Sequence, residues 1–351
     1  MREAAMVESA VMAGTGFELL VQAGAVADPV WRGVPTGCAA FRRRLLEGPD
    51  APSEAEVSRV GRLGWLNLMP LLASSPDGYG VAQLLEVVRA LAPARLHRVL
   101  LGGERRQLRA VVDDALLDAA VAGERAACSR LREVLRREDL VVGATEHLLR
   151  TSSPRLYAQV VGVLARWRAR LDPGGGDDGA RDLEAEARVF EAELTREGPV
   201  RYLERTVPGM TYRLAASDRV AVVVSPSTAP VVVDALEQVL VVHPPLLARS
   251  AYGDPSGDLP TARLVELGRA VGDATRERIV AALADRDHSA VRLAERLGAP
   301  RTTLLHHLAL LRSAGLLHVE VSPGSATVYR LRPEGLLELS RLAQTYAQPT
   351  R

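Results

Sequence analysis

Apolar residues recur every three or four positions along most of the chain, and this spacing places them on one face of an α-helix. Between residues 1 and 171, clusters of Pro and Gly break the pattern into short stretches. The hydrophobic pattern therefore predicts a mostly helical N-terminal domain over residues 1–171.

Residues 182–248 follow the Gly-rich run 172–179, and the spacing of their apolar residues changes from a helical to a strand pattern part-way. Residues 182–197 form one charged amphipathic pattern of helical spacing. Short runs rich in β-branched residues then lie between Pro and Ser breaks, at 212–214, 220–224, 231–233 and 239–242. Such runs are typical of strands. We expect residues 182–248 to form a small α+β segment with a sheet.

Residues 259–351 give the clearest order of elements. Four helical stretches, two β-type runs and a final helix follow one another, at about 261–271, 274–284, 290–297, 301–313, 316–322, 326–332 and 334–347. Asp273 can cap the second helix, and Pro300 stands at the start of the fourth, where a missing N–H costs nothing. Helix, turn, helix and β-wing predict a winged helix-turn-helix, an architecture that places a helix in the DNA major groove.

The fourth of these helices has two unlike faces. Its helical period gathers Leu304, Leu308 and Leu311 on the side that packs on the third helix. His307 falls beside this core, so we interpret it as a structural imidazole. The opposite side carries Arg, Thr and His at the N-terminal end, where helix-turn-helix proteins read bases. The candidate DNA-binding residues are Arg301, Thr302, Thr303, Leu305 and His306 on the helix and Arg330 on the wing.

These candidates have chemical partners on duplex DNA. Arg301 can donate two hydrogen bonds to O6 and N7 of guanine, and Leu305 and the methyl group of Thr302 can meet a thymine methyl. Thr302, Thr303 and the helix N-terminus can hold a phosphate. The predicted wing tip carries no Arg or Lys, so its phosphate contact must be weak or come from Arg330 or Arg332, and we assign it to Arg330.

Three motifs in this region follow the pattern of one family. Residues 273–276 read D-x-T-R, residues 306–311 read H-H-L-x-x-L, and residues 312–316 read R-x-A-G-L. In these motifs the C-terminal domain resembles the arsenic-repressor (ArsR/SmtB-type) winged-helix family. The resemblance implies repression of a promoter by a homodimer whose interface is formed by the helices at about 261–271 and 334–347.

The metal sites of that family have no counterpart in this sequence. The thiolate site would fall at Ser289 and Val291, which cannot bind a soft metal, and the last helix has no His. His288 stands beside Asp285 and Asp287, and we interpret these three residues as part of a solvated loop before a helix. We therefore expect a metal-independent protein with no metal and no cofactor.

The charge distribution agrees with a C-terminal DNA-binding domain. The 351 residues carry a formal net charge of +1, and 47% of them are apolar, as in ordinary globular proteins. From residue 259 to the end, 13 Arg stand against 9 Asp and Glu, a net charge of +4, so the rest of the chain carries −3. A basic domain joined to an acidic region suits contact with nucleic acid.

Other sequence features place the chain in a reducing compartment. Cys38 and Cys128 are far apart in a chain too large to need a disulfide, and we interpret them as buried free thiols. The N-terminus lacks the pattern of a signal peptide, and no run of 18 uncharged apolar residues would span a membrane. We expect a cytoplasmic protein.

The sequence favours a DNA-binding transcriptional regulator, mainly α with small β elements. No G-x-S-x-G or H-E-x-x-H motif occurs, so we do not expect an enzyme. The N-terminal region would sense a small molecule or a protein, or enforce dimerisation.

Two alternatives stay open, an enzyme with an accessory winged helix and an interaction module whose winged helix binds protein. A pocket in residues 1–250 with converging titratable groups of perturbed pKa would favour the enzyme, and an uncharged apolar pocket would favour a sensor.

Overall fold

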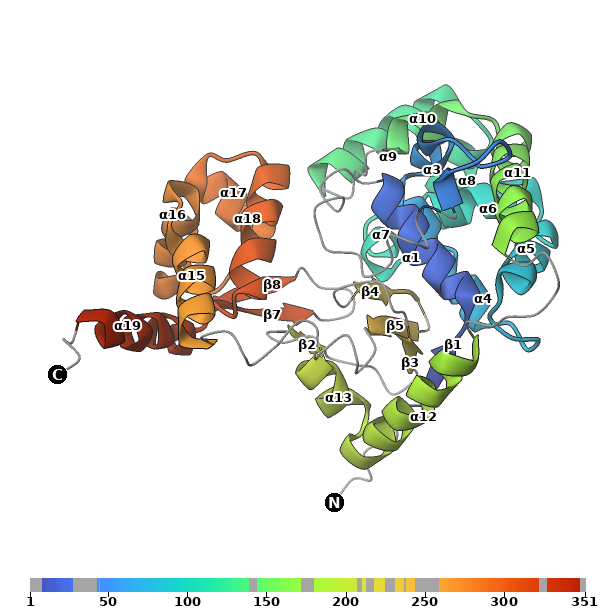
Figure 1. Ribbon diagram of the computed structural model, residues 1–351. Helices are drawn as coiled ribbons and strands as arrows, with labels where there is room; N and C mark the ends of the chain where they lie inside the picture. The colour runs from blue at the N-terminus through green and yellow to red at the C-terminus, as the bar shows by residue number, and fades with distance from the viewer. Residues whose placement is uncertain are drawn as a thin grey trace, which may run out of the picture. The chain divides into compact units, whose positions relative to one another are not determined.

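In a computed structural model, the chain forms two compact units. The first unit comprises Met1–Pro199 and Ala216–Arg249, and the second comprises Val200–Ala215 and Ser250–Arg351 (Figure 1). The structure describes residues 8–27, 43, 45–138, 144–171, 180–206, 210–212, 218–224, 231–236, 238–243, 259–321 and 327–347.

The first unit is mostly helical, as the hydrophobic pattern predicted. Its helices are α1 (Thr15–Ala27), α3 (Glu54–Leu66), α4 (Met69–Ala73), α5 (Val81–Arg89), α6 (Pro93–Leu100), α7 (Arg106–Arg109), α8 (Asp114–Val121), α9 (Arg125–Arg137), α10 (Thr145–Arg150), α11 (Ser153–Leu171) and α12 (Ala180–Glu197). Its strands are β1 (Glu8–Ala13), β3 (Arg219–Val224), β4 (Val231–Asp234) and β5 (Gln238–His243).

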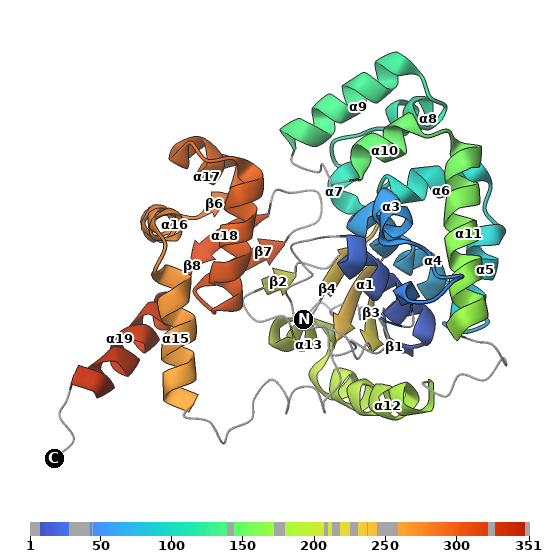
Figure 2. The same ribbon diagram turned by 45° about the horizontal axis from the view of Figure 1, so that its top comes forward.

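The sheet of the first unit has the strand order β1-β3-β5-β4. β1, β3 and β5 run parallel, and β4 pairs antiparallel with β5. Every residue from Val220 to Val224 is buried, as in parallel strands that are covered on both faces. α12 packs along β1 and β3 on one face, and α1 and α4 lie on the other (Figure 2).

This sheet differs from the sheet that the sequence predicted. The hydrophobic pattern predicts a sheet within residues 182–248 and no strand in the helical region before them, where β1 lies. In the structure, Val11 of β1 lies opposite Val222 of β3, so the strands of 182–248 complete their sheet with the first residues of the chain. The proposed boundaries at 171, 182, 248 and 259 remain a prediction about independent folding.

α1 forms the centre of the first unit. Each of its residues from Gly16 to Val26 is buried, which is typical of a helix that is apolar on every side. Its two large polar side chains bond to each other, with Gln22 Nε2 donating to Glu18 Oε1 over 2.9 Å. The core around α1 continues to α3 and α11, whose side-chain rings of Trp65 and Trp167 lie 5.3 Å apart.

A buried ion pair joins α7 to the sheet. The guanidinium of Arg106 donates to both carboxylate oxygens of Asp218 over 2.9 and 2.6 Å, and its Nε donates to the carbonyl oxygen of Ala235 over 2.6 Å. The two charged side chains are only 9% and 3% exposed. Because removal of either partner would leave a buried charge unpaired, this bidentate pair fixes where α7 sits against β3 and β4.

The thiol of Cys128 is free and buried, as predicted. Its Sγ lies 3.4 Å from the carbonyl oxygen of Ala120, and burial raises the pKa of the thiol. Cys38 lies outside the described residues. Among the described residues, no helix is long and apolar enough to cross a membrane.

The second unit has, over residues 259–347, the order of helices and wing strands that the sequence predicted, and it also includes a short helix and two short strands that the sequence did not predict there. Its elements are α13 (Pro199–Thr206), β2 (Met210–Tyr212), α15 (Leu259–Val271), α16 (Ala274–Asp285), β6 (His288–Ser289), α17 (Ala290–Leu297), α18 (Arg301–Ser313), β7 (Leu317–Val321), β8 (Val328–Leu331) and α19 (Pro333–Ala347). The mainly α fold class with small sheets is confirmed.

The sheet of the second unit has the order β2-β7-β8-β6. β7 and β8 form the predicted antiparallel wing, and β6 pairs with β8. β2 pairs parallel with β7, and Thr211 Oγ1 lies 2.8 Å from Nε2 of His318. The sequence predicts this strand in the sheet of residues 182–248, beside its neighbours in sequence, whereas in the structure it joins the wing.

We expect the substitution Glu56→Gln to destabilise the first unit in a pH-dependent way. Glu56 caps α3 with Ser53 and accepts a hydrogen bond from Arg166 of α11 over 2.6 Å. That bond, together with the backbone N–H of Ser53, lowers the pKa of Glu56 from 4.5 to about 2. A lowered pKa stabilises the fold above pH 4.5, and this contribution is lost as the pH falls toward 2.

Urea denaturation followed by tryptophan fluorescence measures this difference. The deficit of Glu56→Gln should be largest at pH 7 and should shrink below pH 4.5, whereas the exposed control Glu133→Gln should change little at either pH. An equal deficit at pH 7 and pH 3 would contradict the assignment.

Candidate nucleic-acid interface

A tight turn sets the angle between α17 and α18. Ser289 caps the start of α17 by accepting from the backbone N–H of Arg292 over 3.4 Å. Gly298 ends the helix with φ of 61°, a left-handed conformation that glycine adopts without steric cost. The N–H of Ala299 donates to the carbonyl oxygen of Ala294, which completes a C-cap. α18 starts directly after Pro300, as predicted.

α18 packs on the rest of the unit through one face. Leu304, Leu308 and Leu311 are no more than 1% exposed and join one core with α15, α16 and α17. Thr303 lies on the exposed surface, and Leu310 is 38% exposed. The two faces that the helical period predicted are therefore present.

Of the predicted base-reading residues, the structure describes the side chain of Leu305 but not those of the other three. Leu305 is half-buried against the core, so only part of its side chain is free for a methyl contact. Arg301, Thr302 and His306 occupy α18 positions whose side chains lie outside the described residues. Their assignment stays a prediction.

A junction of three side chains fixes α18 against α15 and α16. Asp273 caps α16 by accepting from the backbone N–H groups of Thr275 and Arg276, each over 3.0 Å. The Arg276 side chain reaches back to α15, where it donates to the carbonyl oxygens of Ala270 and Arg269 over 2.6 and 2.7 Å. Its Nη1 also lies 3.4 Å from Nδ1 of His307 on α18.

This junction explains the D-x-T-R motif and the placement of His307. The Arg276 side chain is 14% exposed, the His307 side chain is 13% exposed, and Nδ1 of His307 is 3.7 Å from Oδ1 of Asp273. The backbone N–H of Arg276 donates to the Asp273 carboxylate and lowers its pKa. The sequence-based interpretation of His307 as a structural imidazole agrees with these contacts.

The wing residue Arg330 is already paired. Its Nε and Nη2 donate to Oδ2 of Asp287 over 2.9 and 2.7 Å, and the Asp287 carboxylate raises the pKa of the guanidinium. A DNA phosphate at this position would have to replace Asp287. The wing tip, residues 322–326, lies outside the described residues.

α17 carries arginines that the sequence analysis did not single out. The Arg292 side chain is 76% exposed and lies 3.7 Å from Glu295. Arg296 is 44% exposed and bonds to Asp285 over 3.2 Å. The first helix of a helix-turn-helix crosses the DNA backbone, so the exposed position of Arg292 before the turn was a signal available in the sequence.

His288 lies in a short strand rather than in the predicted solvated loop. It pairs with Tyr329 of β8, is half-buried, and its Nε2 lies 3.3 Å from Nη1 of Arg296. Desolvation lowers the pKa of His288, and the nearby Arg296 and Arg286 lower it further. Burial against β8, which the local sequence does not reveal, accounts for the difference.

The positions where the resemblance would place metal ligands hold no soft or imidazole groups. Ser289 serves as the α17 cap, Val291 is half-buried, and α19 has no His along its length. Across the described ranges, no group of three or more His, Cys, Asp or Glu side chains is arranged to hold a metal ion.

Comparisons with known proteins agree with this geometry. A family model described as a helix-turn-helix domain matches residues 271–320, from the end of α15 into β7. The C-terminal segment is a winged helix-turn-helix domain. Over 86 residues, 24% of this chain, the sequence is 38% identical to the HTH-type transcriptional regulator KmtR of Mycobacterium tuberculosis. The aligned part covers 65% of that relative's length.

We expect Arg276→Ala and His307→Ala to lower the thermal stability of the winged helix-turn-helix domain. Arg276→Ala removes charged hydrogen bonds to two backbone carbonyls, and loss of such bonds costs about 1.5–3 kcal/mol. Differential scanning calorimetry of the full chain measures the effect, with the exposed Arg292→Ala as a matched control that should stay within about 0.5 kcal/mol. Equal transition temperatures for all three variants would show that the junction does not hold α18.

Proposed function

We propose that this chain is a sequence-specific DNA-binding transcriptional regulator of the ArsR/SmtB type that represses its promoter. The observation that carries the proposal is the α17–turn–α18 geometry, in which α18 is buried on one face and exposed on the other, within a segment that matches a helix-turn-helix domain. The similarity to a protein named as a transcriptional regulator supports it. In this proposal α18 lies in the major groove.

The N-terminal half of α18 would read the bases. Arg301 would donate two hydrogen bonds to a guanine, Leu305 would use its exposed part on a thymine methyl, and Thr302 and His306 would complete the contact. Thr303, which is exposed near the helix N-terminus, would bind phosphate together with the free N–H groups of the first turn.

Phosphate contacts outside α18 would position the domain without reading sequence. Arg330 would exchange its bond to Asp287 for a phosphate, and Arg292 would reach the backbone from α17. Since Arg330 must first leave Asp287, its contribution would be smaller than that of an unpaired arginine.

We propose a homodimer formed through α15 and α19. These two helices contact each other, and each presents a large exposed apolar side chain, Val265 at 44% and Leu337 at 63% exposure. Two copies of the domain would then place two α18 helices on successive turns of DNA, and the operator would be a near-palindrome.

The proposal assigns no metal, no cofactor and no catalytic step to this chain. The support for metal independence is the chemistry of Ser289 and Val291 and the lack of His in α19. The first unit would act as the sensing or dimerising part. Regulation by an effector, a small molecule or a protein, would come through this unit.

Substitutions at Arg301 and Arg330 separate base reading from phosphate contact. On the cognate operator, Arg301→Ala should cost about 1–3 kcal/mol of binding free energy and blur the preference at one symmetric pair of base positions. Arg330→Ala should weaken all sequences about equally and make the salt dependence shallower. Fluorescence anisotropy with the full chain, on cognate and scrambled duplexes at several salt concentrations, measures both effects.

Two outcomes of that titration would contradict the proposal. A uniform loss for Arg301→Ala on every sequence would mean that α18 docks on the DNA backbone. DNA binding by the wild-type chain that is absent or does not depend on salt would favour the alternative of a protein-interaction module.

We expect Zn²⁺ to leave operator binding unchanged. The positions of the family's metal sites offer hydroxyl and aliphatic groups, and Zn²⁺ in proteins prefers Cys and His ligands. Anisotropy titrations with and without equimolar Zn²⁺, followed by addition of a chelator, test this expectation. Release of DNA at stoichiometric Zn²⁺, reversed by the chelator, would show that a metal is the effector.

A further inference from the structure

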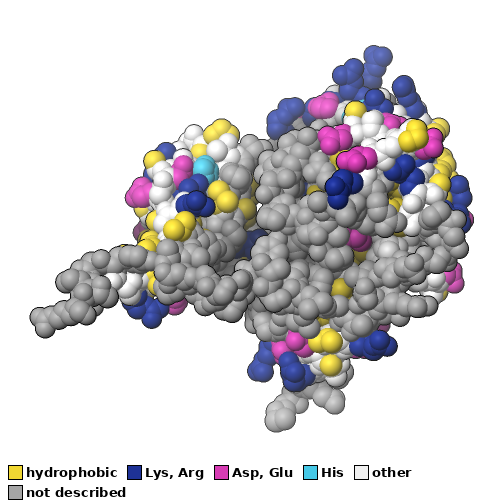
Figure 3. Space-filling model, viewed as in Figure 1, with side chains coloured by type: hydrophobic (Ala, Val, Ile, Leu, Met, Phe, Trp, Pro, Cys, Tyr) yellow, Lys and Arg dark blue, Asp and Glu magenta, His cyan; other side chains and the backbone are white. Residues whose placement is uncertain are grey.

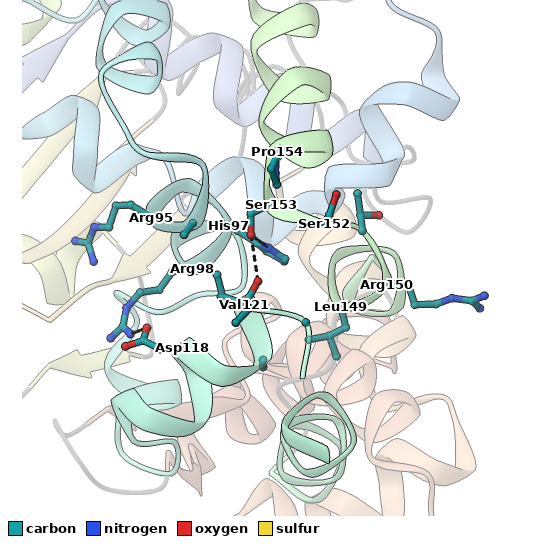
Figure 4. Close-up of a pocket in the computed structure, with 15 residues that line it drawn as sticks. Arg95, His97, Arg98, Asp118, Val121, Leu149, Arg150, Ser152, Ser153 and Pro154 are labelled. Carbon is teal, nitrogen blue, oxygen red and sulfur yellow. Dashed lines mark hydrogen bonds and ion pairs between the residues drawn. The ribbon is translucent and has the colours of Figure 1, made fainter. Parts of the chain in front are cut away.

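The first unit contains a cavity of about 620 Å³. It lies between α6, the C-terminal end of α8, and the junction of α10 with α11 (Figure 4). Ligand pockets of proteins have volumes of about 300–1,000 Å³. Alanine, valine and leucine side chains share its lining with hydroxyl groups and arginines, so the cavity has both apolar and polar walls.

A chain of hydrogen bonds, here named the His97 relay, ties the three walls together. Nε2 of His97 lies 3.0 Å from the carbonyl oxygen of Leu148 in α10, and Nδ1 lies 2.9 Å from Oγ of Ser153 in α11. The Ser153 hydroxyl lies 3.1 Å from the carbonyl oxygen of Val121 in α8. Figure 4 shows His97 and Ser153 side by side in the middle of the lining.

The relay needs one more proton than a neutral imidazole supplies. A carbonyl oxygen only accepts, so Nε2 must donate to Leu148 and the hydroxyl of Ser153 must donate to Val121. Nδ1 can then bond to Oγ only by donating as well. All three bonds form together only when His97 is an imidazolium, and with a neutral ring one bond is left unmade.

Burial disfavours the charged form of His97. Its side chain is 2% exposed, and desolvation lowers its pKa. The imidazolium therefore needs a nearby negative charge to offset the loss of hydration. An anion inside the cavity would supply this charge and complete the relay.

The arginines around the cavity are paired with acidic side chains or lie at its rim. Arg98 is engaged by Asp114 and Asp118, and Arg95 lies 2.8 Å from Glu104. Arg150 is exposed at the rim, where Figure 4 shows it directed away from the relay.

Other titratable groups on neighbouring elements have partners of their own. These contacts are Glu146 with Arg132, His147 with Gln159 and Thr151, and Cys128 with the Ala120 carbonyl.

We infer that this cavity binds a small organic acid with an apolar body, and that binding makes His97 take up a proton. The carboxylate would lie near His97 and the serines of the α10–α11 junction, with Arg150 turning inward, and the apolar part would rest on the alanine and leucine side chains. In the framework of the proposed function, this acid is the effector.

The same contacts argue for binding rather than catalysis. The Ser153 hydroxyl is within hydrogen-bond distance of Val121, and both ring nitrogens of His97 have partners. A proton taken up by His97 completes existing bonds, and no covalent step is required. The His97 and Ser153 side chains in the lining form hydrogen bonds that join helices of the fold.

The test uses the full chain and matched pairs of probes. Benzoate, phenylacetate and indole-3-acetate are each compared with their neutral primary amides by isothermal titration calorimetry. At least one acid should bind with Kd below about 1 mM and about tenfold or more tighter than its amide. Titration in two buffers of different ionisation heat should give net proton uptake at pH 7.5, and affinity should fall as the pH rises from 6 to 8.

Variants assign the effect to named side chains. His97→Gln should abolish proton uptake and the pH dependence, and Arg150→Gln should weaken the acid several-fold without changing the amide. Arg136→Gln, on α9 outside the lining, should behave as wild type. If thermal unfolding shows that His97→Gln does not fold, Ser153→Ala takes its place, because it also breaks the relay and should reduce proton uptake.

Several results would overturn the inference. These are no binding by any of the three acids, equal binding of acid and amide, or proton uptake that persists in the folded His97→Gln or Ser153→Ala variant. An acid that binds and leaves operator affinity unchanged would overturn its role as effector. DNA binding without any acid tests the proposed function separately, so the two failures are distinguishable.

Discussion

The orientation of α18 depends on the contacts of the Arg276 side chain. One guanidinium bonds to two carbonyl oxygens at the end of α15 and approaches His307 on α18, while the backbone N–H of the same residue caps α16 through Asp273. Three helices thus share one charged residue. With the angle of α18 fixed in this way, the apolar face of the helix is buried and its other face is presented as a rigid surface.

The first unit is organised around a comparable constraint. The pair formed by Arg106 and Asp218 anchors α7 on the sheet through a bidentate contact that is closed to solvent. The helices that follow, α8 to α10, build a smaller core of their own around Leu117, Leu131 and Leu149. The cavity at the His97 relay lies where this smaller core meets α6 and α11. Ligand pockets often lie at such junctions between packed bodies.

Local signals made much of the second unit predictable from the sequence. Asp273 and Pro300 mark helix starts, Gly298 marks the turn, and Leu304, Leu308 and Leu311 mark a buried stripe, and each acts within a few residues of its own position. The same signals led to α18 as the candidate site and to His307 as a structural residue.

Contacts between distant residues could not be predicted in this way. β1 pairs with β3 from the other end of its unit, and β2 joins the wing rather than the sheet nearest in sequence. The bond between Arg330 and Asp287 joins residues 43 positions apart. The cavity likewise combines α6, α8 and α11, whose hydroxyl and imidazole groups carry no motif. Strand pairing and ion pairing at such separations depend on tertiary packing, which hydrophobic period alone does not encode.

Hydroxyl-radical footprinting of the full chain on its own promoter DNA tests the central claim most directly. We expect protection at two half-sites centred about 10 base pairs apart on one face of the duplex, with related and inverted sequences, because two α18 helices would enter successive major grooves. Uniform protection that does not depend on sequence, or no protection at protein concentrations that saturate non-specific DNA, would contradict sequence-specific binding through α18.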